Sequence, residues 1–176
     1  MLKVYERAFD ANEWFVLANL LVSLILIWKL PKKLSGLETA VHITIGIFIG
    51  MFFDHTISVG AWDFYDVNDT SKYQFIDFLS YIMYGPYSYF FIYLYVKLNL
   101  KGYMNILYVT LWSILAVVIE WFSVKLGLFH YEKGYHMAWS FPIYAFVQTL
   151  QIMFYKTSLK MEKGMNKGLS AKQRCE

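Results

Sequence analysis

Five long stretches of the chain consist mainly of apolar residues. They cover residues 13–30, 38–58, 75–97, 102–125 and 137–156, and shorter segments richer in lysine, aspartate and glycine separate them. A helix that crosses the hydrocarbon core of a bilayer, about 30 Å thick, needs roughly 20 mostly apolar residues. Because lipid offers the backbone no hydrogen-bond partner, such stretches must be helical. The pattern predicts an all-α, polytopic membrane helical bundle of five transmembrane helices, in one membrane domain over residues 1–176.

Composition supports a membrane protein over a soluble helical bundle. The chain is 58% hydrophobic and 16% charged, whereas an average soluble domain is about a quarter charged. Five buried helices in 176 residues would leave too little polar surface to cover a soluble fold. Cys175 is the single cysteine, which excludes a disulfide framework within one chain. We expect membrane lipids as partners, no nucleic acid and no cofactor.

The positive charges predict an orientation in the plasma membrane. Lysine and arginine favour the cytoplasmic side of short loops. One set of loops and the C-terminal segment carry 11 of these residues, including the lysines at 29, 32, 33, 97 and 101, and the other set carries 5. We therefore expect the N-terminus outside and the C-terminus in the cytoplasm. Residues 157–176 form a basic cytoplasmic tail, in which lysines recur at helical spacing.

The two outer loops resemble each other. The first runs from Asp54 through Gly60 and Trp62 to Tyr65, and the second runs from Glu120 through Gly127 to Tyr131. In each loop a carboxylate near the end of an outgoing helix precedes a glycine, an aromatic residue and a tyrosine. The similarity suggests a parallel, two-hairpin internal repeat of helices two–three and four–five. At the helical rise of about 1.5 Å per residue, both carboxylates lie near the outer edge of the hydrocarbon.

Ionisable residues in membrane segments are functional candidates, because their insertion is costly. Asp54 and Glu120 lie near helix C-terminal ends, where the helix dipole disfavours negative charge. We therefore expect each to have a partner, such as His55, Lys125, His130 or a loop amide. The candidate ligand-binding residues are Asp54, His55, Trp62, Asp77, Tyr84, Glu120, His130 and Tyr131. Asp77 and Glu13 also fit as N-terminal acids of their helices, and Asp10 with Glu13 resembles a capping box.

Neither a metal site nor a catalytic set is predicted. His55 with the nearby aspartates has suitable ligand chemistry, but no His-x-x-x-His or Glu-x-x-His spacing occurs. No nucleophile elbow, phosphate loop or dinucleotide fingerprint is present. Two carboxylates beside an apolar pocket could instead perform acid–base chemistry on a lipid or isoprenoid, because desolvation raises a carboxyl pKa.

Four segments together resemble a known family. FDHTISVGAWDFYD, GPYSYFFIYLYVK, WSILAVVIEWFSVKLGLFHYEKG and SFPIYAFVQ are similar to a family of small multi-pass membrane proteins from endospore-forming Gram-positive bacteria. The resemblance covers roughly residues 40–156. It implies a bacterial plasma-membrane protein of about five helices, and it supplies neither an activity nor catalytic residues.

Three functions remain open at this point. The first is non-enzymatic binding of a small or lipid-like ligand, or of a membrane partner, at an outer-leaflet groove lined by Asp54, His55 and Glu120. The second is a membrane enzyme that uses Glu120 and Asp54 as acid and base. The third is a small oligomeric transporter, which the few polar residues in the inner half, such as His42 and Gln151, support least.

Overall fold

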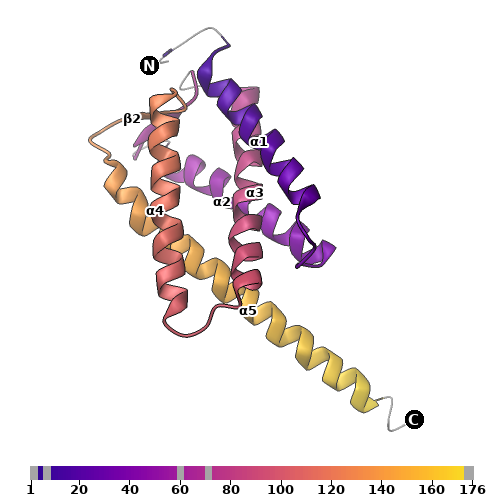
Figure 1. The fold of residues 1–176 in the computed structure, drawn as a ribbon. Coiled ribbons are helices and arrows are strands. Elements are labelled where there is room, and N and C mark those ends of the chain that lie inside the picture. The colour runs from indigo at the N-terminus through magenta and orange to yellow at the C-terminus, as the bar shows by residue number, and fades with distance from the viewer. Residues whose placement is uncertain (1–3, 6–8, 59–61, 70–72, 173–176) are drawn as a thin grey trace.

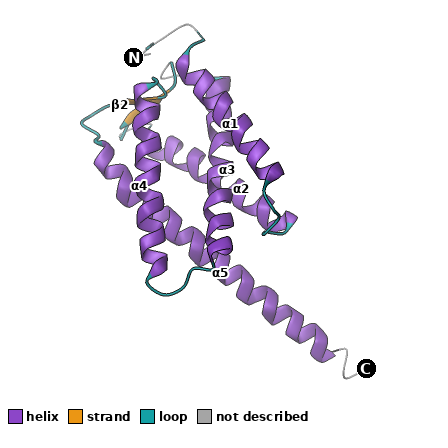
Figure 2. Ribbon diagram, in the orientation of Figure 1, coloured by secondary structure: helices purple, strands orange, loops and turns teal. Residues whose placement is uncertain are grey.

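Helices make up nearly all of the structure. The computed structural model describes residues 4–5, 9–58, 62–69 and 73–172, and side chains as far as Gly164. Within these residues the long helices are α1 (Ala11–Lys29), α2 (Gly36–Ile57), α3 (Phe75–Leu98), α4 (Met104–Lys125) and α5 (Ser140–Lys172). A single 3₁₀ turn, η1 (Met137–Trp139), precedes α5, and two short strands are β1 (Tyr65–Val67) and β2 (Phe129–Tyr131). The all-helical class is confirmed (Figures 1 and 2).

Local signals at the helix starts act as their residue types predict. Asp10 and Glu13 form a capping box at α1, as expected. Ser35 and Glu38 form another at α2. Asp77 accepts from the backbone N–H of Gln74 at the start of α3. These side chains bind backbone N–H groups that have no partner within a helix, and they place acids at the positive end of the helix dipole.

The central helix of the bundle is α3. It packs against α1, α2 and α5, and in Figure 1 it runs beside α4. The α2–α3 contact is the closest, because glycines face each other there. A Cβ atom built on Gly46 would lie 2.5 Å from the carbonyl oxygen of Tyr84 and 2.6 Å from the Cβ of Ser88. The absence of a side chain at Gly46 therefore sets how near the two helices approach.

The helix bounds differ most from the predicted ones at the C-terminal end. There the last helix does not end near residue 156 but continues without a break to Lys172, and Figure 1 shows it extending well away from the other helices. The lysines at 156, 160 and 163 lie on this extension and follow its helical spacing. The basic tail is thus, as far as Lys172, a continuation of α5 rather than a separate segment.

Three helices are long and apolar enough to cross a membrane, and these are α1, α2 and α4. Many of their large apolar side chains face outward, among them Leu21, Phe48 and Ile106. Such surfaces are compatible with a membrane location. The described α3 and α5 do not meet the same criterion of length and hydropathy. The hydropathy of α3 is low because it contains several tyrosine, serine and glycine residues. Half of the residues of α3 are buried.

The loops that follow α2 and α4 meet in a small antiparallel sheet. In it Tyr65 lies opposite Tyr131, Asp66 opposite His130 and Val67 opposite Phe129. Tyr65 and Tyr131 each follow their loop's carboxylate by eleven residues. Residues 60 and 61 of the suggested repeat, and Cys175, lie outside the described residues. The sheet lies at the end of the bundle where α1 and α3 begin and α2 and α4 end (Figure 2).

Candidate functional site: a cavity between two carboxylates

A cavity of about 230 Å³ lies beneath the small sheet, among α2, α3, α4 and α5. Apolar and aromatic side chains form most of its wall, including Phe53, Phe91 and Trp112. Tyr65, Val67, Phe129 and Tyr131 of the sheet line its outer end. Asp54 and Glu120 both line it as well. The predicted carboxylates, which are 66 residues apart in the chain, therefore face one shared space.

Glu120 is held by three hydroxyl groups. Its Oε1 accepts from Tyr131 at 2.6 Å and from Ser140 at 2.7 Å, and its Oε2 accepts from Tyr144 at 2.9 Å. Ser140 in turn pairs with the hydroxyl of Tyr135 at 2.9 Å. The side chain is buried. Tyr131 comes from β2, and Ser140 and Tyr144 come from the first turns of α5, so Glu120 ties these elements to α4.

Burial raises the pKa of the Tyr131 hydroxyl, and the hydrogen bond to Glu120 raises it further. The hydroxyl therefore keeps its proton, and its role as donor to Glu120, throughout the physiological pH range. Tyr65, the sheet partner of Tyr131, also has a raised pKa. Burial is its main cause, and the negative charge of Asp54 adds to it.

Asp54 has a smaller set of partners, from α2 and α3. Its carboxylate accepts from the hydroxyl of Tyr81 and, at 3.2 Å, from that of Ser58. Ser58 also donates to the backbone carbonyl of Asp54 at the end of α2. Hydroxyl donors thus take the place of the expected partners. Lys125 instead lies over the ring of Trp121, 6.0 Å from its centroid.

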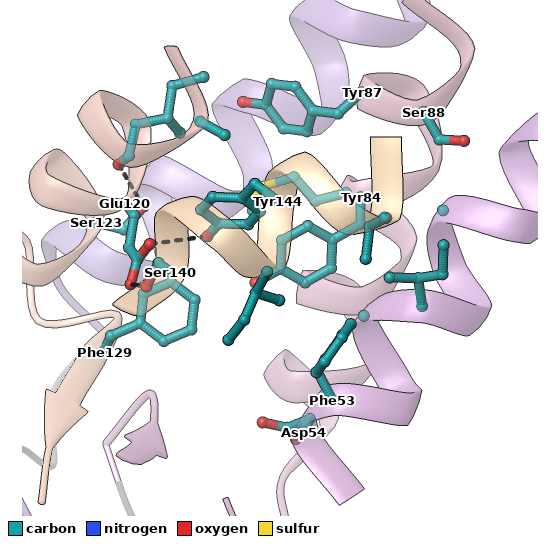
Figure 3. A pocket seen from close by; sticks show the side chains of 18 of the residues that line it. Phe53, Asp54, Tyr84, Tyr87, Ser88, Glu120, Ser123, Phe129, Ser140 and Tyr144 are labelled. Atoms are coloured by element: carbon teal, nitrogen blue, oxygen red, sulfur yellow. Dashed lines mark hydrogen bonds between the residues drawn. The ribbon is translucent and has the colours of Figure 1, made fainter. Parts of the chain in front are cut away.

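Tyrosine side chains line the cavity beside its two carboxylates. Figure 3 shows Tyr144 directed toward Glu120, with Tyr84 between Tyr144 and Asp54. Tyr84 lies within electrostatic range of both carboxylates. Within the described residues the hydroxyls of Tyr84 and Tyr65 form no hydrogen bond, although both residues line the cavity. Two phenol groups are therefore available to a bound molecule.

The deep end of the cavity is polar and internally hydrogen-bonded. Gln151 donates to the hydroxyl of Ser88 and, at 3.1 Å, to its backbone carbonyl. Gln148 accepts from Ser113 at 2.9 Å. His42 is buried beside this group, with its ring 3.5 Å from the amide of Gln151. Ser140 and Gln151 both line the cavity. They are eleven residues apart on α5, so the cavity extends about 16 Å along this helix.

The other predicted site residues lie outside the cavity wall. His55 is exposed, and its Nδ1 lies 2.8 Å from the carbonyl oxygen of Met51. Trp62 is also exposed. Asp77 is buried where it caps α3, and it accepts a hydrogen bond from Asn68 at 2.5 Å. The His130 ring stacks on Tyr5 at 3.8 Å. Of the eight candidates, Asp54, Tyr84, Glu120 and Tyr131 line the cavity. Among the described residues no three His, Cys, Asp or Glu side chains gather in a way that could hold a metal ion.

Four site residues were missed: Tyr65, Tyr81, Ser140 and Tyr144. The tyrosines of α3 recur at helical spacing, which fits both a packed helix face and the wall of a ligand pocket, so Tyr81 was not distinguished from the others. Ser140 and Tyr144 carried a usable signal. They are spaced i and i+4 at the start of a helix, so both point to one side of it. Nothing in the sequence, however, showed that this side faces Glu120.

An apolar groove adjoins the cavity on the side of α2 and α5. It has a volume of about 480 Å³, and Phe48, Leu150 and Phe154 are among the residues that line it. Ile49, Val147 and Gln151 line both the groove and the cavity. Phe48 is 64% exposed, so the groove opens on the outer surface of the bundle. A molecule lying in the groove would therefore be next to the cavity.

The fold and the cavity define a helical protein with membrane-compatible helices and a partly open, acidic, tyrosine-rich pocket. Comparisons with protein-family models, with curated proteins and with solved structures find no match. The functional argument therefore rests on the site itself.

Proposed function

We propose that this protein is a multi-pass plasma-membrane protein whose cavity binds a lipid-like ligand in the outer half of the bilayer. The observation that carries the proposal is the shared cavity, in which Asp54 from one helix pair and Glu120 from the other face a space lined mainly by apolar and aromatic side chains. Pockets that hold small molecules are typically apolar with a few converging polar groups. This pocket has that composition.

Five membrane spans, with the N-terminus outside, complete the proposal. Polar residues are tolerated in membrane helices when they face the bundle interior. That condition fits α3, whose Ser80, Ser88 and Tyr81 are buried. The apolar first part of α5 packs against α4, and its lysines follow beyond residue 155. The low hydropathy of these two helices is therefore compatible with a membrane location, and the lysine distribution gives the orientation.

The suggested repeat is supported by the pairing of the two loops. Tyr65 and Tyr131 occupy equivalent places in the repeat and lie opposite each other in the sheet. Each follows its carboxylate by the same number of residues. A repeat of two hairpins around one cavity would place one acid on each side of a ligand, and sites at repeat interfaces are common in membrane proteins.

Access from the membrane is favoured over access from the outer aqueous side. The small sheet and its tyrosines line the outer end of the cavity. The groove between α2 and α5 is apolar and opens where lipid would surround the helices. A chain of methylene groups lying in this groove gains the packing that an apolar surface offers. The ligand class that suits both features has a polar head and an apolar tail.

The same two carboxylates also support an alternative, a membrane enzyme acting on a lipid or isoprenoid. Asp54 and Glu120 would then act as acid and base toward a substrate held between them, as general acid–base catalysis requires groups within hydrogen-bond reach of the substrate. Binding and catalysis differ in one result: an enzyme converts the bound lipid, whereas a binding protein releases it unchanged.

The experiment uses a matched pair of substitutions on α4. Ala116 lines the cavity, whereas Val118 is exposed on the same helix and does not line it. Ala116→Phe is expected to reduce labelling by a photoactivatable lipid in membranes, and Val118→Phe is expected to leave it unchanged. Ile49→Trp, at the junction of cavity and groove, is expected to act like Ala116→Phe. Unchanged labelling in both cavity variants, with thermal unfolding showing that they are folded, would contradict the proposal.

A further inference from the structure

We infer that the cavity selects amphiphiles with a cationic head, such as an amine or a quaternary ammonium group. This inference rests on the proposed function and names the chemistry of the ligand. It follows from the charge of the cavity wall, from the partners of its two carboxylates and from the faces of its tyrosines.

Among the described residues, the wall contains carboxylates but no basic side chain. Asp54 and Glu120 line the cavity, and no described lysine, arginine or histidine does so. Within the described part of the chain neither carboxylate forms an ion pair. The described ion pair of the outer loops, Lys133 with Asp63 at 3.3 Å, lies outside the cavity wall. His55, outside the wall, attracts Asp54 electrostatically, and a cation in the cavity would add compensating charge for both acids.

The hydroxyl groups around Glu120 support this reading. A buried carboxylate normally needs a charged partner or several hydrogen bonds. Glu120 has three hydroxyl donors, and such donors stabilise a negative charge without cancelling it. The electric field of the carboxylate therefore still reaches the cavity. Asp54, which accepts from Tyr81 and Ser58, acts in the same way from the other side.

The tyrosines contribute both ring faces and free hydroxyls. A cation over an aromatic face is attracted by the ring quadrupole, and cages of aromatic rings are a common means of binding quaternary ammonium groups. In Figure 3 Tyr84 lies beside Tyr144 and above Asp54, and it lines the cavity. The hydroxyls of Tyr84 and Tyr65 have no partner within the described residues, so a protonated amine could also donate to them.

An anionic head would be strongly disfavoured in the same place. It would approach two carboxylates in a water-poor space, where like charges repel more strongly than in bulk water. It would also find no basic side chain among the described residues of the cavity wall. A neutral head would gain hydrogen bonds but no charge attraction. The expected order of affinity is therefore cationic, then neutral, then anionic.

The test measures head-group preference at a constant chain length. The purified full chain in neutral maltoside micelles is titrated with dodecyltrimethylammonium, dodecanol or dodecanoate, and bound radiolabelled probe is counted. We expect the cationic probe to bind about tenfold or more tightly than dodecanol, a ratio equivalent to about 1.4 kcal/mol or more, and dodecanoate to bind least. Asp54→Asn with Glu120→Gln is expected to abolish this preference, whereas Glu162→Gln, on the exposed part of α5, should retain it.

The outcomes separate this inference from the proposed function. Equal binding of the three probes to the wild-type chain would refute cation selection and leave lipid binding standing. Binding of none of them would contradict both. Preference retained in the double variant would refute the assigned role of the carboxylates. The wild-type comparison needs no substitution, so it decides the question even if the double variant fails to fold.

Discussion

Glu120→Ala is expected to destabilise the contacts among α4, β2 and the start of α5. Glu120 joins α4 to β2 and to the start of α5 through three hydroxyl donors. Glu120→Ala leaves Tyr131 and Tyr144 without their acceptor, while Ser140 keeps its contact with Tyr135. A buried group left without a hydrogen bond is costly to the folded state.

The magnitude follows from the number of lost bonds. A typical hydrogen bond contributes about 1 kcal/mol net, so Glu120→Ala is expected to cost about 3 kcal/mol of unfolding free energy. Glu120→Gln keeps one oxygen acceptor and adds an N–H₂ donor that can bind the oxygen of Tyr144. It should therefore cost only about 1 kcal/mol. Tyr131→Phe and Tyr144→Phe each remove one bond, and each should also cost about 1 kcal/mol.

Denaturant unfolding of the purified protein in micelles measures these differences. Glu162→Gln serves as the control, because Glu162 is exposed, and it should change the unfolding free energy by less than about 0.5 kcal/mol. If Glu120→Ala proves as stable as Glu120→Gln, the three hydroxyl contacts do not stabilise the fold as argued.

Three further predictions concern packing, pH and topology. Gly46→Ala forces a Cβ into the backbone of α3 and should cost about 1–3 kcal/mol of unfolding free energy. Gly164→Ala, with open space around it, should instead stabilise α5 by about 0.5–1 kcal/mol. Thermal unfolding of both variants measures these changes, and equal effects would count against close α2–α3 packing. The pKa of Tyr131 is raised in the folded state. Its contribution to stability is therefore complete below pH 10 and is lost as the pH rises toward that folded-state pKa. The unfolding free energy should fall above pH 10 in the wild type, and it should fall less in Tyr131→Phe. In intact cells, a membrane-impermeant thiol reagent should label Lys133→Cys and not Lys32→Cys, and the reverse pattern would overturn the orientation.

The helices were predictable from the sequence because each apolar stretch is long enough to form one. Asp10 with Glu13 marked the start of α1 correctly. The end of α5 was less predictable: lysine spacing indicated helicity beyond residue 156, but composition alone suggested a separate tail. By hydropathy α1, α2 and α4 qualify as membrane spans, and α3 and α5 do not. A helix inside a bundle need not be apolar on every side.

The site was predictable in its acids and less so in its tyrosines. Asp54 and Glu120 were singled out because carboxylates near helix C-terminal ends oppose the helix dipole. Their partners were expected to be histidine, lysine or loop amides, and hydroxyl groups hold them instead. In an aromatic-rich helix, the sequence does not distinguish a tyrosine that only packs from one that also donates a hydrogen bond, because both roles use the same side chain. Only the arrangement of the helices shows which tyrosines face the cavity.

An experimental structure of the protein purified with native lipid in nanodiscs tests the central claim most directly. The account predicts elongated density with its polar end between Asp54 and Glu120, beside Tyr84, and with its apolar part running toward the groove between α2 and α5. The Ala116→Phe variant, solved in the same way, should lack that density. A cavity that contains only water in the wild-type protein, with lipid excluded from the groove, would contradict the account.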